Sequence, residues 1–337
     1  MANHINNEAF LVLGAGSWGS ALAIHLASLT HQVMLYCHDP VQAKLMQSDR
    51  INRHYLPESP FPDTLSVTYD FKAYMAQIKH ILIAVPSNAF KSVLTQIIPY
   101  LSRQHTVLWA TKGLCSKEHR LLSEVAKDLL PTFTPYGVIT GPSFAKEVAK
   151  HLPTAVLVAS NQITFAQQMQ SLWTGNYFRC YISDDLIGAQ VGGAVKNVLA
   201  IAVGISDGLG FGSNAKAALI TRGLAEMTRF GLKLGAQKET ISGLACLGDL
   251  VLTCTDNQSR NRRFGLLLGQ GESKNNAINQ IGQVVEGYET TEHIYYLAKK
   301  LTIEMPIVNQ TYAVLYQDKN PLDAVNSLMG RELKTES

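Results

Sequence analysis

One lysine in the second half of the chain has surroundings suited to proton transfer. Around it, a small residue recurs every four positions, giving the series Gly188, Gly192, Lys196, Ala200 and Gly204. On a helix this spacing forms one slowly winding stripe, so another backbone or a ligand can approach Lys196 closely. The rest of the segment is strongly apolar, which would desolvate the ammonium and lower its pKa toward the range useful in acid–base catalysis. The alternative is a lysine that extends to the surface and forms a structural salt bridge.

A glycine-rich segment near the N-terminus could hold a phosphate group. The GxGxxG motif reads Gly14, Ala15, Gly16, Ser17, Trp18 and Gly19. It follows an apolar run at 10–13 and opens a helical pattern. In that context the glycines allow a tight turn and a close approach to a pyrophosphate, which the helix N-terminus stabilises. The motif therefore predicts dinucleotide binding, with a plain structural turn as the alternative.

The residues after the second expected strand bear on the choice of dinucleotide. A NAD-specific site usually has an acidic residue there to bind the ribose, but this chain has Cys37 and His38, and Asp39 comes later. His38 could face a 2′-phosphate. Basic residues that could assist it are Lys44, Arg50 and Arg53. Otherwise His38 begins a surface loop and Asp39 caps a helix. We expect NADP(H), or the use of both NADP(H) and NAD(H).

These residues need a scaffold, and the pattern of expected secondary structure changes once along the chain. Strands are expected at 10–13, 33–36, 81–85, 106–110, 136–140, 155–159 and 178–181, with helical patterns between them, including 117–130. Apolar strands that alternate with helices indicate a doubly wound parallel sheet. After about residue 184 strand signals vanish and Ala/Leu/Gly-rich helical runs follow. We expect an α/β fold, with a Rossmann-like domain over 1–189 and an all-helical domain over 190–337.

Composition narrows the class of protein. A net charge of +3 is too mild to indicate a nucleic-acid partner, although it would not repel an anionic metabolite. The five cysteines are scattered without a CxxC pair, and the histidines show no ligand spacing, so neither disulfides nor a metal are expected. We see no signal-peptide pattern and no apolar run near the ~20 residues of a membrane span. We therefore expect a cytoplasmic protein.

Several motifs, taken in order, resemble those of the NAD(P)-dependent glycerol-3-phosphate dehydrogenases of bacterial type. They are TKGL at 111–114, GPSFA at 141–145, GAVKNVLA at 193–200 with DGLGFGSN at 207–214, and GDL at 248–250 with NQSRN at 257–261. The resemblance extends from the GxGxxG motif to about Pro306. It implies interconversion of sn-glycerol 3-phosphate and dihydroxyacetone phosphate with NAD(P)(H), supply of glycerol 3-phosphate for phospholipid synthesis, and a homodimer.

The resemblance also implies roles for individual residues. Lys196 would exchange the proton at the substrate oxygen, Lys112 would contact substrate and cofactor, and Asp249 would orient the substrate hydroxyls and could position Lys196. The substrate-binding set is Lys112, Gly141, Ser143, Asn197, Asp249, Thr253, Ser259, Arg260 and Asn261. The cofactor-binding set is Gly14, Gly16, Ser17, Trp18, Gly19, His38, Lys112, Ala145, Arg260, Val284 and Glu286.

The residues alone leave some of these roles open. Lys112 could lie in a solvated loop, and Asp249 could be a simple carboxylate in the first turn of a helix. Ser259 is expected to be an N-cap, so that free N–H groups and a guanidinium converge on a phosphate. Arg262 and Arg263 could compete with Arg260 for that phosphate. The basic cluster 259–263 could also be a solvated helix face.

Two other functions remain as alternatives. A 3-hydroxyacid or phosphogluconate-type NADP dehydrogenase also pairs a Rossmann domain with a helical domain and a catalytic lysine, but the SRN run at 259–261 after Asp249 argues against it. A non-catalytic dinucleotide-binding redox sensor would have no reason to keep Lys112, Lys196 and Asp249 together. We therefore expect a phosphorylated hydroxy/keto substrate.

Overall fold

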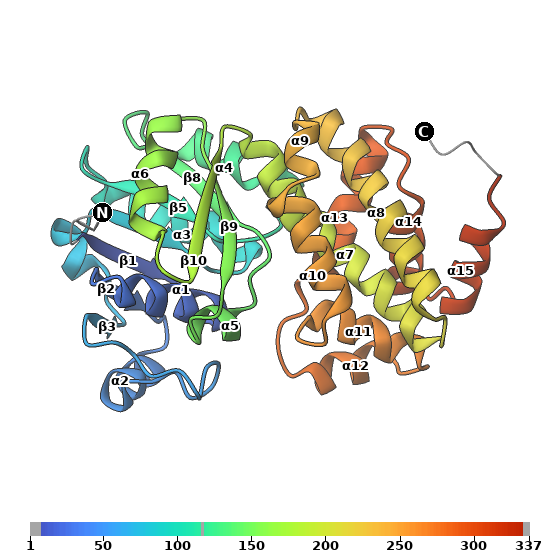
Figure 1. Ribbon diagram of the computed structural model, residues 1–337, viewed down its shortest axis with the longest axis horizontal. Helices are drawn as coiled ribbons and strands as arrows, with labels where there is room; N and C mark the ends of the chain where they lie inside the picture. The colour runs from blue at the N-terminus through green and yellow to red at the C-terminus, as the bar shows by residue number, and fades with distance from the viewer. Residues whose placement is uncertain (1–7, 116–117, 333–337) are drawn as a thin grey trace. The chain divides into compact units, whose positions relative to one another are not determined.

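The computed structural model describes residues 8–115 and 118–332 (Figure 1). Within this part the chain divides into two compact units. The first contains the described residues up to Cys115 and Arg120–Gln190. The second contains the described residues from Val191 onward together with residues 118–119.

The first unit is built on an eight-stranded sheet with the order β10-β9-β8-β5-β4-β1-β2-β3. The strands are β1 (Ala9–Leu13), β2 (Gln32–Tyr36), β3 (Leu65–Thr68), β4 (His80–Ile83), β5 (Thr106–Trp109), β8 (Tyr136–Thr140), β9 (Thr154–Ala159) and β10 (Phe178–Ser183). All neighbouring pairs are parallel except β8 and β9. The expected doubly wound, parallel-dominated sheet is confirmed.

The sheet departs from expectation at one edge. β9 pairs with β8 in antiparallel register, with Ile139 opposite Val158, and β10 then follows β9 in parallel. The connection from β8 runs through the five-residue helix α5 (Ala145–Ala149), which is too short for the usual helical crossover between parallel strands. Sequence patterning also missed β3, a short strand on the opposite edge.

Helices fill the connections of this unit. They are α1 (Ser17–Ser28), α2 (Pro40–Asp49), α3 (Ser87–Ile97), α4 (Leu122–Leu129), α5 and α6 (Ile163–Trp173). The helix expected over 117–130 begins only at Leu122, because Arg120–Leu121 (β7) pairs with Leu114–Cys115 (β6) in a hairpin. Lys117 lies outside the described residues. α1 is buried continuously from Gly19 to Ala27, so the helix after the glycine motif is anchored in the core.

The second unit is helical throughout its described residues. Its helices are α7 (Leu186–Gly208), which begins at the end of the first unit, α8 (Ser213–Leu234), α9 (Lys238–Ile241), the π-helix η3 (Leu244–Gly248), α10 (Asp249–Thr255), α11 (Arg260–Gly269), α12 (Lys274–Ile281), α13 (Glu286–Lys300), α14 (Pro306–Tyr316) and α15 (Pro321–Met329). The expected change from an α/β region to helices is therefore confirmed.

Two of these helices pack with their backbones in close contact. A Cβ on Gly204 of α7 would collide with the carbonyl oxygen of Arg262 on α11, and one on Gly265 of α11 would collide with that of Ile201. One turn further on, Gly208 and Gly269 repeat the arrangement. Only glycine leaves room for this approach, so these positions fix the spacing of α7 and α11.

α7 also corrects an expectation about apolar runs. Among the described residues it is the one helix long and apolar enough to cross a membrane by length and composition. However, 83% of its most apolar window is buried inside the protein. A buried helix at the centre of a helical unit needs the same apolar composition as a membrane span, and this explains the hydropathy of α7.

Candidate active site

The glycine motif forms a tight strand-to-helix turn in the first unit. Gly14 follows β1 with φ of +118°, and a side chain there would strike the carbonyl oxygen of Ala84. A Cβ on Gly19 would collide with the carbonyl of Gly14, so the start of α1 packs directly on the turn. Gly16, the N-cap of α1, faces open space instead. The three glycines thus allow the turn, the helix packing and an open approach to the helix N-terminus, the geometry that a pyrophosphate requires.

Other residues of the motif line the same turn. Ser17 is the first residue of α1, and the half-buried Trp18 packs against the core of the unit. The indole Nε1 of Trp18 is buried without a hydrogen-bond partner among the described residues. The first turn of α1 has no acidic side chain. An anionic group at this N-terminus would therefore meet N–H dipoles and no carboxylate from the first turn of α1.

The segment after β2 leaves His38 as the candidate for contacting the cofactor ribose. Asp39 caps α2, and its Oδ1 accepts hydrogen bonds from the N–H groups of Val41 and Gln42 at 2.8 and 3.2 Å. The carboxylate of Asp39 is thus occupied by hydrogen bonds from backbone N–H groups. His38 is exposed.

Two of the basic residues expected to help His38 are used elsewhere. Arg50 donates to the carbonyl oxygens of Leu65 and Pro62 at 2.6 and 2.5 Å, and Arg53 pairs with Asp49 at 2.7 Å. Lys44 lies over the ring of Tyr69, 5.9 Å from its centroid. No acidic side chain directly follows β2, so the feature that would select NAD over NADP is missing.

Three residues expected to bind substrate meet at the carboxyl edge of the sheet. Lys112 lies in the loop after β5, and its Nζ donates to the carbonyl oxygen of Gly141 at 3.4 Å. Ser143 Oγ donates to the same oxygen at 2.9 Å. Gly141 follows β8 with φ of +134°, a conformation that disfavours other residues. Ala145, expected to contact the cofactor, is the first residue of α5.

In the second unit Lys196 forms a buried ion pair. Its Nζ donates to Asp249 Oδ1 at 2.6 Å and to Thr253 Oγ1 at 2.9 Å. The side chains of Lys196 and Asp249 are 8% and 1% exposed. The structural salt bridge that was the alternative for this lysine is thus present, but it joins the two residues to which the resemblance gives roles at the reacting oxygen and the substrate hydroxyls. A buried ammonium held by one carboxylate and one hydroxyl is fixed in position and shielded from water.

A π-helix directly precedes Asp249. η3 ends at Gly248, and α10 begins at Asp249. Gly192, one turn before Lys196, packs so closely on η3 that a Cβ would collide with the backbone of Ala245 and with Cys246. The stripe predicted on α7 therefore admits another backbone at Gly192 and at Gly204, on both sides of Lys196. Short π-helical segments are rare and are frequently found at functional sites.

The basic cluster at the start of α11 divides into two roles. Ser259 is the N-cap, as expected, and its Oγ accepts from the N–H of Arg262 at 3.2 Å. The guanidinium of Arg262 donates to Asp207 and Asn257. Arg260 forms no hydrogen bond or ion pair with any side chain or carbonyl in the described part of the chain. Arg260 is consequently the better candidate for binding an anion.

The expected substrate ligands Asn197 and Asn261 contact each other. Asn261 Nδ2 donates to Asn197 Oδ1 at 3.0 Å, and Asn261 Oδ1 accepts from the N–H of Gly287 at 2.9 Å. This links α7, α11 and the start of α13. Next to Gly287, Glu286 is the half-buried first residue of α13, and Val284 is 59% exposed before it.

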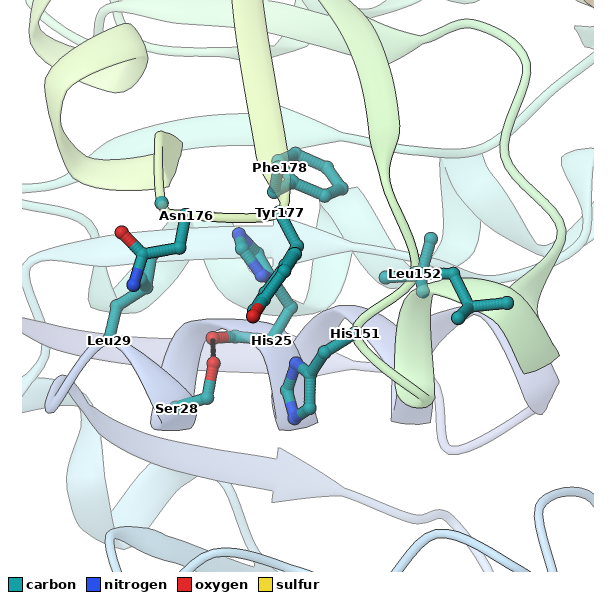
Figure 2. Close-up of a pocket in the computed structure, with 10 residues that line it drawn as sticks. His25, Ser28, Leu29, His151, Leu152, Asn176, Tyr177 and Phe178 are labelled. Carbon is teal, nitrogen blue, oxygen red and sulfur yellow. Dashed lines mark hydrogen bonds between the residues drawn. The ribbon is translucent and has the colours of Figure 1, made fainter.

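The first unit also contains a cavity at the far end of α1 from the glycine motif. Figure 2 shows it between the end of α1, the residues after α5 and the turn before β10. It has a volume of about 210 Å³. The glycine motif is at the other end of α1, a helix of 12 residues and so roughly 18 Å long. The cavity is therefore separate from the glycine motif.

The histidine at the base of this cavity is a core residue. His25 Nε2 lies 2.8 Å from the carbonyl oxygen of Trp173, and its ring stacks on Phe178 with centroids 4.0 Å apart. Burial lowers the pKa of His25 to about 4. In Figure 2 the hydroxyl of Ser28 donates to the backbone carbonyl of His25, at 2.6 Å. These contacts are those of a neutral structural histidine.

Sequence reasoning missed the contact between Arg262 and Asp207 and the π-helix before Asp249. Arg262 and Asp207 are 55 positions apart, and only the fold brings them together. The one available signal was that both residues lie within motifs of the resemblance or beside them. The π-helix is only five residues long, which is too short for a periodicity to be visible in the sequence.

Comparisons with known proteins agree with this geometry. The family model described as NAD-dependent glycerol-3-phosphate dehydrogenase N-terminus matches residues 10–166, and the model of the C-terminus of the same family matches residues 185–326. The chain is 54% identical to glycerol-3-phosphate dehydrogenase [NAD(P)+] of Psychromonas ingrahamii, over 98% of this chain and 99% of that protein. It is 52% identical to the protein of that name from Yersinia pestis, over 98% of each. A crystal structure of glycerol-3-phosphate dehydrogenase from Coxiella burnetii is similar with a TM-score of 0.93 and 49% identity, over 96% of this chain and 99% of that one.

Proposed function

This chain belongs to the NAD-dependent glycerol-3-phosphate dehydrogenase family, and we propose from that premise that it interconverts sn-glycerol 3-phosphate and dihydroxyacetone phosphate with NAD(P)(H). The observation that carries the proposal is the buried contact of Lys196 with Asp249 and Thr253. It supplies a fixed proton donor in a unit whose neighbouring helix begins with Ser259 and Arg260. The first unit supplies the dinucleotide turn.

The residues of the first unit fit a nicotinamide dinucleotide. The open space at Gly16 and the N-terminus of α1 suit a pyrophosphate, with Ser17 and Trp18 in the same turn and His38 toward the adenosine ribose. In our proposal Lys112 and Ala145 of this unit, and Arg260, Val284 and Glu286 of the second, complete the cofactor contacts. The reduced cofactor supplies a hydride when bound. Because no acidic residue directly follows β2, we expect NADPH to be accepted at least as well as NADH.

Lys196 handles the proton in this reaction. As the keto carbon of dihydroxyacetone phosphate gains a hydride, its oxygen gains negative charge, and Lys196 Nζ donates a proton to it. The lysine becomes a neutral amine and recovers a proton from water. Asp249 and Thr253 hold Nζ in place throughout, so little reorganisation accompanies the transfer. In the reverse direction Lys196 accepts the hydroxyl proton.

The phosphate of the substrate is assigned to the start of α11. Ser259 caps this ten-residue helix, whose N-terminus carries partial positive charge. Arg260 adds a guanidinium, which matches the geometry of phosphate oxygens. In the first unit Lys112, Gly141 and Ser143 are proposed to contact the remainder of the substrate, as are Asn197 and Asn261 in the second. This division gives each end of a small dianionic molecule its own partners.

We also propose a wider role and assembly. The product glycerol 3-phosphate would feed phospholipid synthesis in the cytoplasm, and the chain would act as a homodimer. The family resemblance supports these proposals. Sedimentation should give a mass about twice the 36.9 kDa of the chain, and a mass near 36.9 kDa would contradict the dimer.

The test of the function follows the near-ultraviolet absorbance of the reduced nicotinamide. Purified protein is mixed with dihydroxyacetone phosphate and either NADPH or NADH, and separately with a 3-keto acid. We expect rapid oxidation of the reduced nicotinamide in the mixture with dihydroxyacetone phosphate and none in the mixture with the 3-keto acid. Oxidation with the keto acid instead would favour the hydroxyacid dehydrogenase, and cofactor binding without turnover of either compound would favour a redox sensor.

A further inference from the structure

Beside the residues proposed to bind phosphate, a second arginine forms a buried ionic contact. Arg262 lies two residues after Arg260, and its side chain is 10% exposed. Its two terminal nitrogens donate to Asp207, near the end of α7, and to Asn257, in the turn before α11. Its Nε is buried with no partner in the described part of the chain. Because both terminal nitrogens are engaged within the protein, this guanidinium serves the fold of the site.

Arg262 holds the turn before α11 from two sides. Its side chain contacts Asn257, and its backbone N–H donates to the N-cap Ser259 at 3.2 Å. Within the turn, the N–H of Ser259 donates to the carbonyl oxygen of Asp256 at 3.3 Å. The segment from Asp256 to Ser259 is thus closed on itself and fastened to Arg262. The position of Arg260, the next residue, depends on this turn.

Asp207 connects the turn to the helix that carries Lys196. It is the penultimate residue of α7, and its side chain is 11% exposed. Lys216 on α8 also contacts it, with Nζ 3.1 Å from Oδ2. Near this contact the backbone of α11 at Arg262 packs against Gly204 of α7. The ion pair and the helix contact together fix the start of α11 relative to α7.

We propose that Arg262 and Asp207 form a clamp that positions Ser259 and Arg260 for the substrate phosphate. This inference rests on the proposed function, and it makes Arg262 a positioning residue. A planar guanidinium can reach two acceptors in two different segments, whereas the single ammonium of a lysine cannot hold both in the same way. The clamp acts on the phosphate contact, which is made equally by substrate and transition state. Loosening it should therefore raise KM much more than it lowers kcat.

The test compares three variants of the full chain. Arg262→Lys keeps the charge but loses the planar guanidinium that donates to two acceptors. Asn257→Ala removes only the acceptor in the turn, at an exposed position. Lys216→Met is the matched control, because Lys216 contacts Asp207 without contacting the turn. The measurements are KM and kcat with dihydroxyacetone phosphate, the inhibition constant of inorganic phosphate, and the melting temperature.

In Arg262→Lys we expect KM and the inhibition constant of phosphate to rise together, by about 10- to 100-fold, as for the loss of one charge-assisted hydrogen bond. We expect kcat to change by less than about threefold. Asn257→Ala should show the same pattern with a smaller rise, and Lys216→Met should resemble the wild type.

Three results would overturn the clamp. The first is a fall in kcat with KM and phosphate inhibition unchanged, and the second is the same rise in KM in Lys216→Met. The third is unchanged KM and unchanged phosphate inhibition in Asn257→Ala. This variant decides the question if Arg262→Lys fails to fold. A wild-type protein that does not reduce dihydroxyacetone phosphate would instead refute the proposed function.

Discussion

At the scale of single residues, the central feature is a lysine that is buried and paired at once. An ammonium with little access to water is costly unless a carboxylate compensates it, and Asp249 does so for Lys196 at 2.6 Å. The hydroxyl of Thr253 bonds to Lys196 Nζ and to the backbone of Asp249, so it fixes both partners. Such a pair fixes the position of the proposed proton donor, at the cost of desolvating two charges.

Removal of the carboxylate should therefore affect both stability and turnover. In Asp249→Asn the charge of Lys196 loses its partner, and we expect the free energy of unfolding in urea to fall by about 3–5 kcal/mol. kcat should fall as well, because Nζ is no longer held. Asp49→Asn removes the carboxylate of an exposed pair with Arg53 and should leave both quantities unchanged. Equal effects in the two variants would show that burial of the pair is unimportant.

A second buried carboxylate makes stability depend on pH. Glu226 on α8 accepts from the N–H groups of Ile307 and Val308 at the start of α14, at 2.6 and 3.2 Å. Burial raises its pKa from 4.5 to about 7, and the two N–H groups oppose this rise. A folded-state pKa above the unfolded value gives a contribution to stability that is present below pH 4.5 and is lost as pH rises through 7.

The variant Glu226→Gln should remove this dependence. Between about pH 4.5 and pH 7 the unfolding free energy of the wild type should fall relative to that of the variant, by on the order of 3 kcal/mol. Urea denaturation of both proteins at the two pH values measures the difference. A difference between the proteins that stays constant with pH would contradict the shifted pKa.

At the scale of elements, α7 organises the second unit through its glycines. Gly192 admits the π-helix before Asp249, and Gly204 admits the start of α11. Lys196 lies between them, so the two backbone contacts set the distance from the lysine to its carboxylate and to the residues proposed to bind the phosphate. A stripe of small residues on one helix thus positions two neighbouring segments.

An added methyl group at Gly204 should separate α7 from α11. Although alanine favours a helix by up to about 1 kcal/mol over glycine, its Cβ would collide with the carbonyl of Arg262. We expect Gly204→Ala to lower the unfolding free energy by a net 1–3 kcal/mol, typical of overpacking, and to raise KM for dihydroxyacetone phosphate. Gly212→Ala, where a Cβ meets open space, is the control. A stabilised Gly204→Ala variant would show that the helices can move apart freely.

Some of these elements could be predicted from the sequence, and others could not. Apolar runs located β1, β2, β4, β5 and β8, and four-residue spacing located the stripe of α7, because these patterns are local. The reversed direction of β9 depends on how the chain turns after β8, and no periodicity encodes it. The residues alone could not separate Arg260 from Arg262, although the resemblance favours Arg260, because the partner of Arg262 is 55 positions away.

At the scale of the whole molecule, buried neutral histidines in both units should set the acid limit of stability. Burial lowers the pKa of His25 and His293 to about 4, and that of His80 to about 3. Because these values lie below the ordinary 6.5, the histidines contribute stability that is present above pH 6.5 and is lost as pH falls toward 4. Glu226 acts in the opposite direction over part of this range.

The melting temperature of Glu226→Gln reports the histidine contribution without the opposing contribution of Glu226. We expect it to fall steadily as pH is lowered from about 6.5 to about 4, as charges are forced into the core. A melting temperature that is constant across this range would contradict the depressed pKa values. The comparison with the wild type, in which Glu226 offsets part of the fall, is the internal control.

The proposed role of Lys196 in moving the proton is tested most directly by one measurement. kcat for reduction of dihydroxyacetone phosphate is measured in Lys196→Ala beside the wild type, with NADPH binding measured separately. We predict a loss of about 10²- to 10⁴-fold in kcat, the usual contribution of a positioned general acid, with NADPH affinity unchanged. A Lys196→Ala variant that folds, binds NADPH and turns over near the wild-type rate would show that the proton comes from another group.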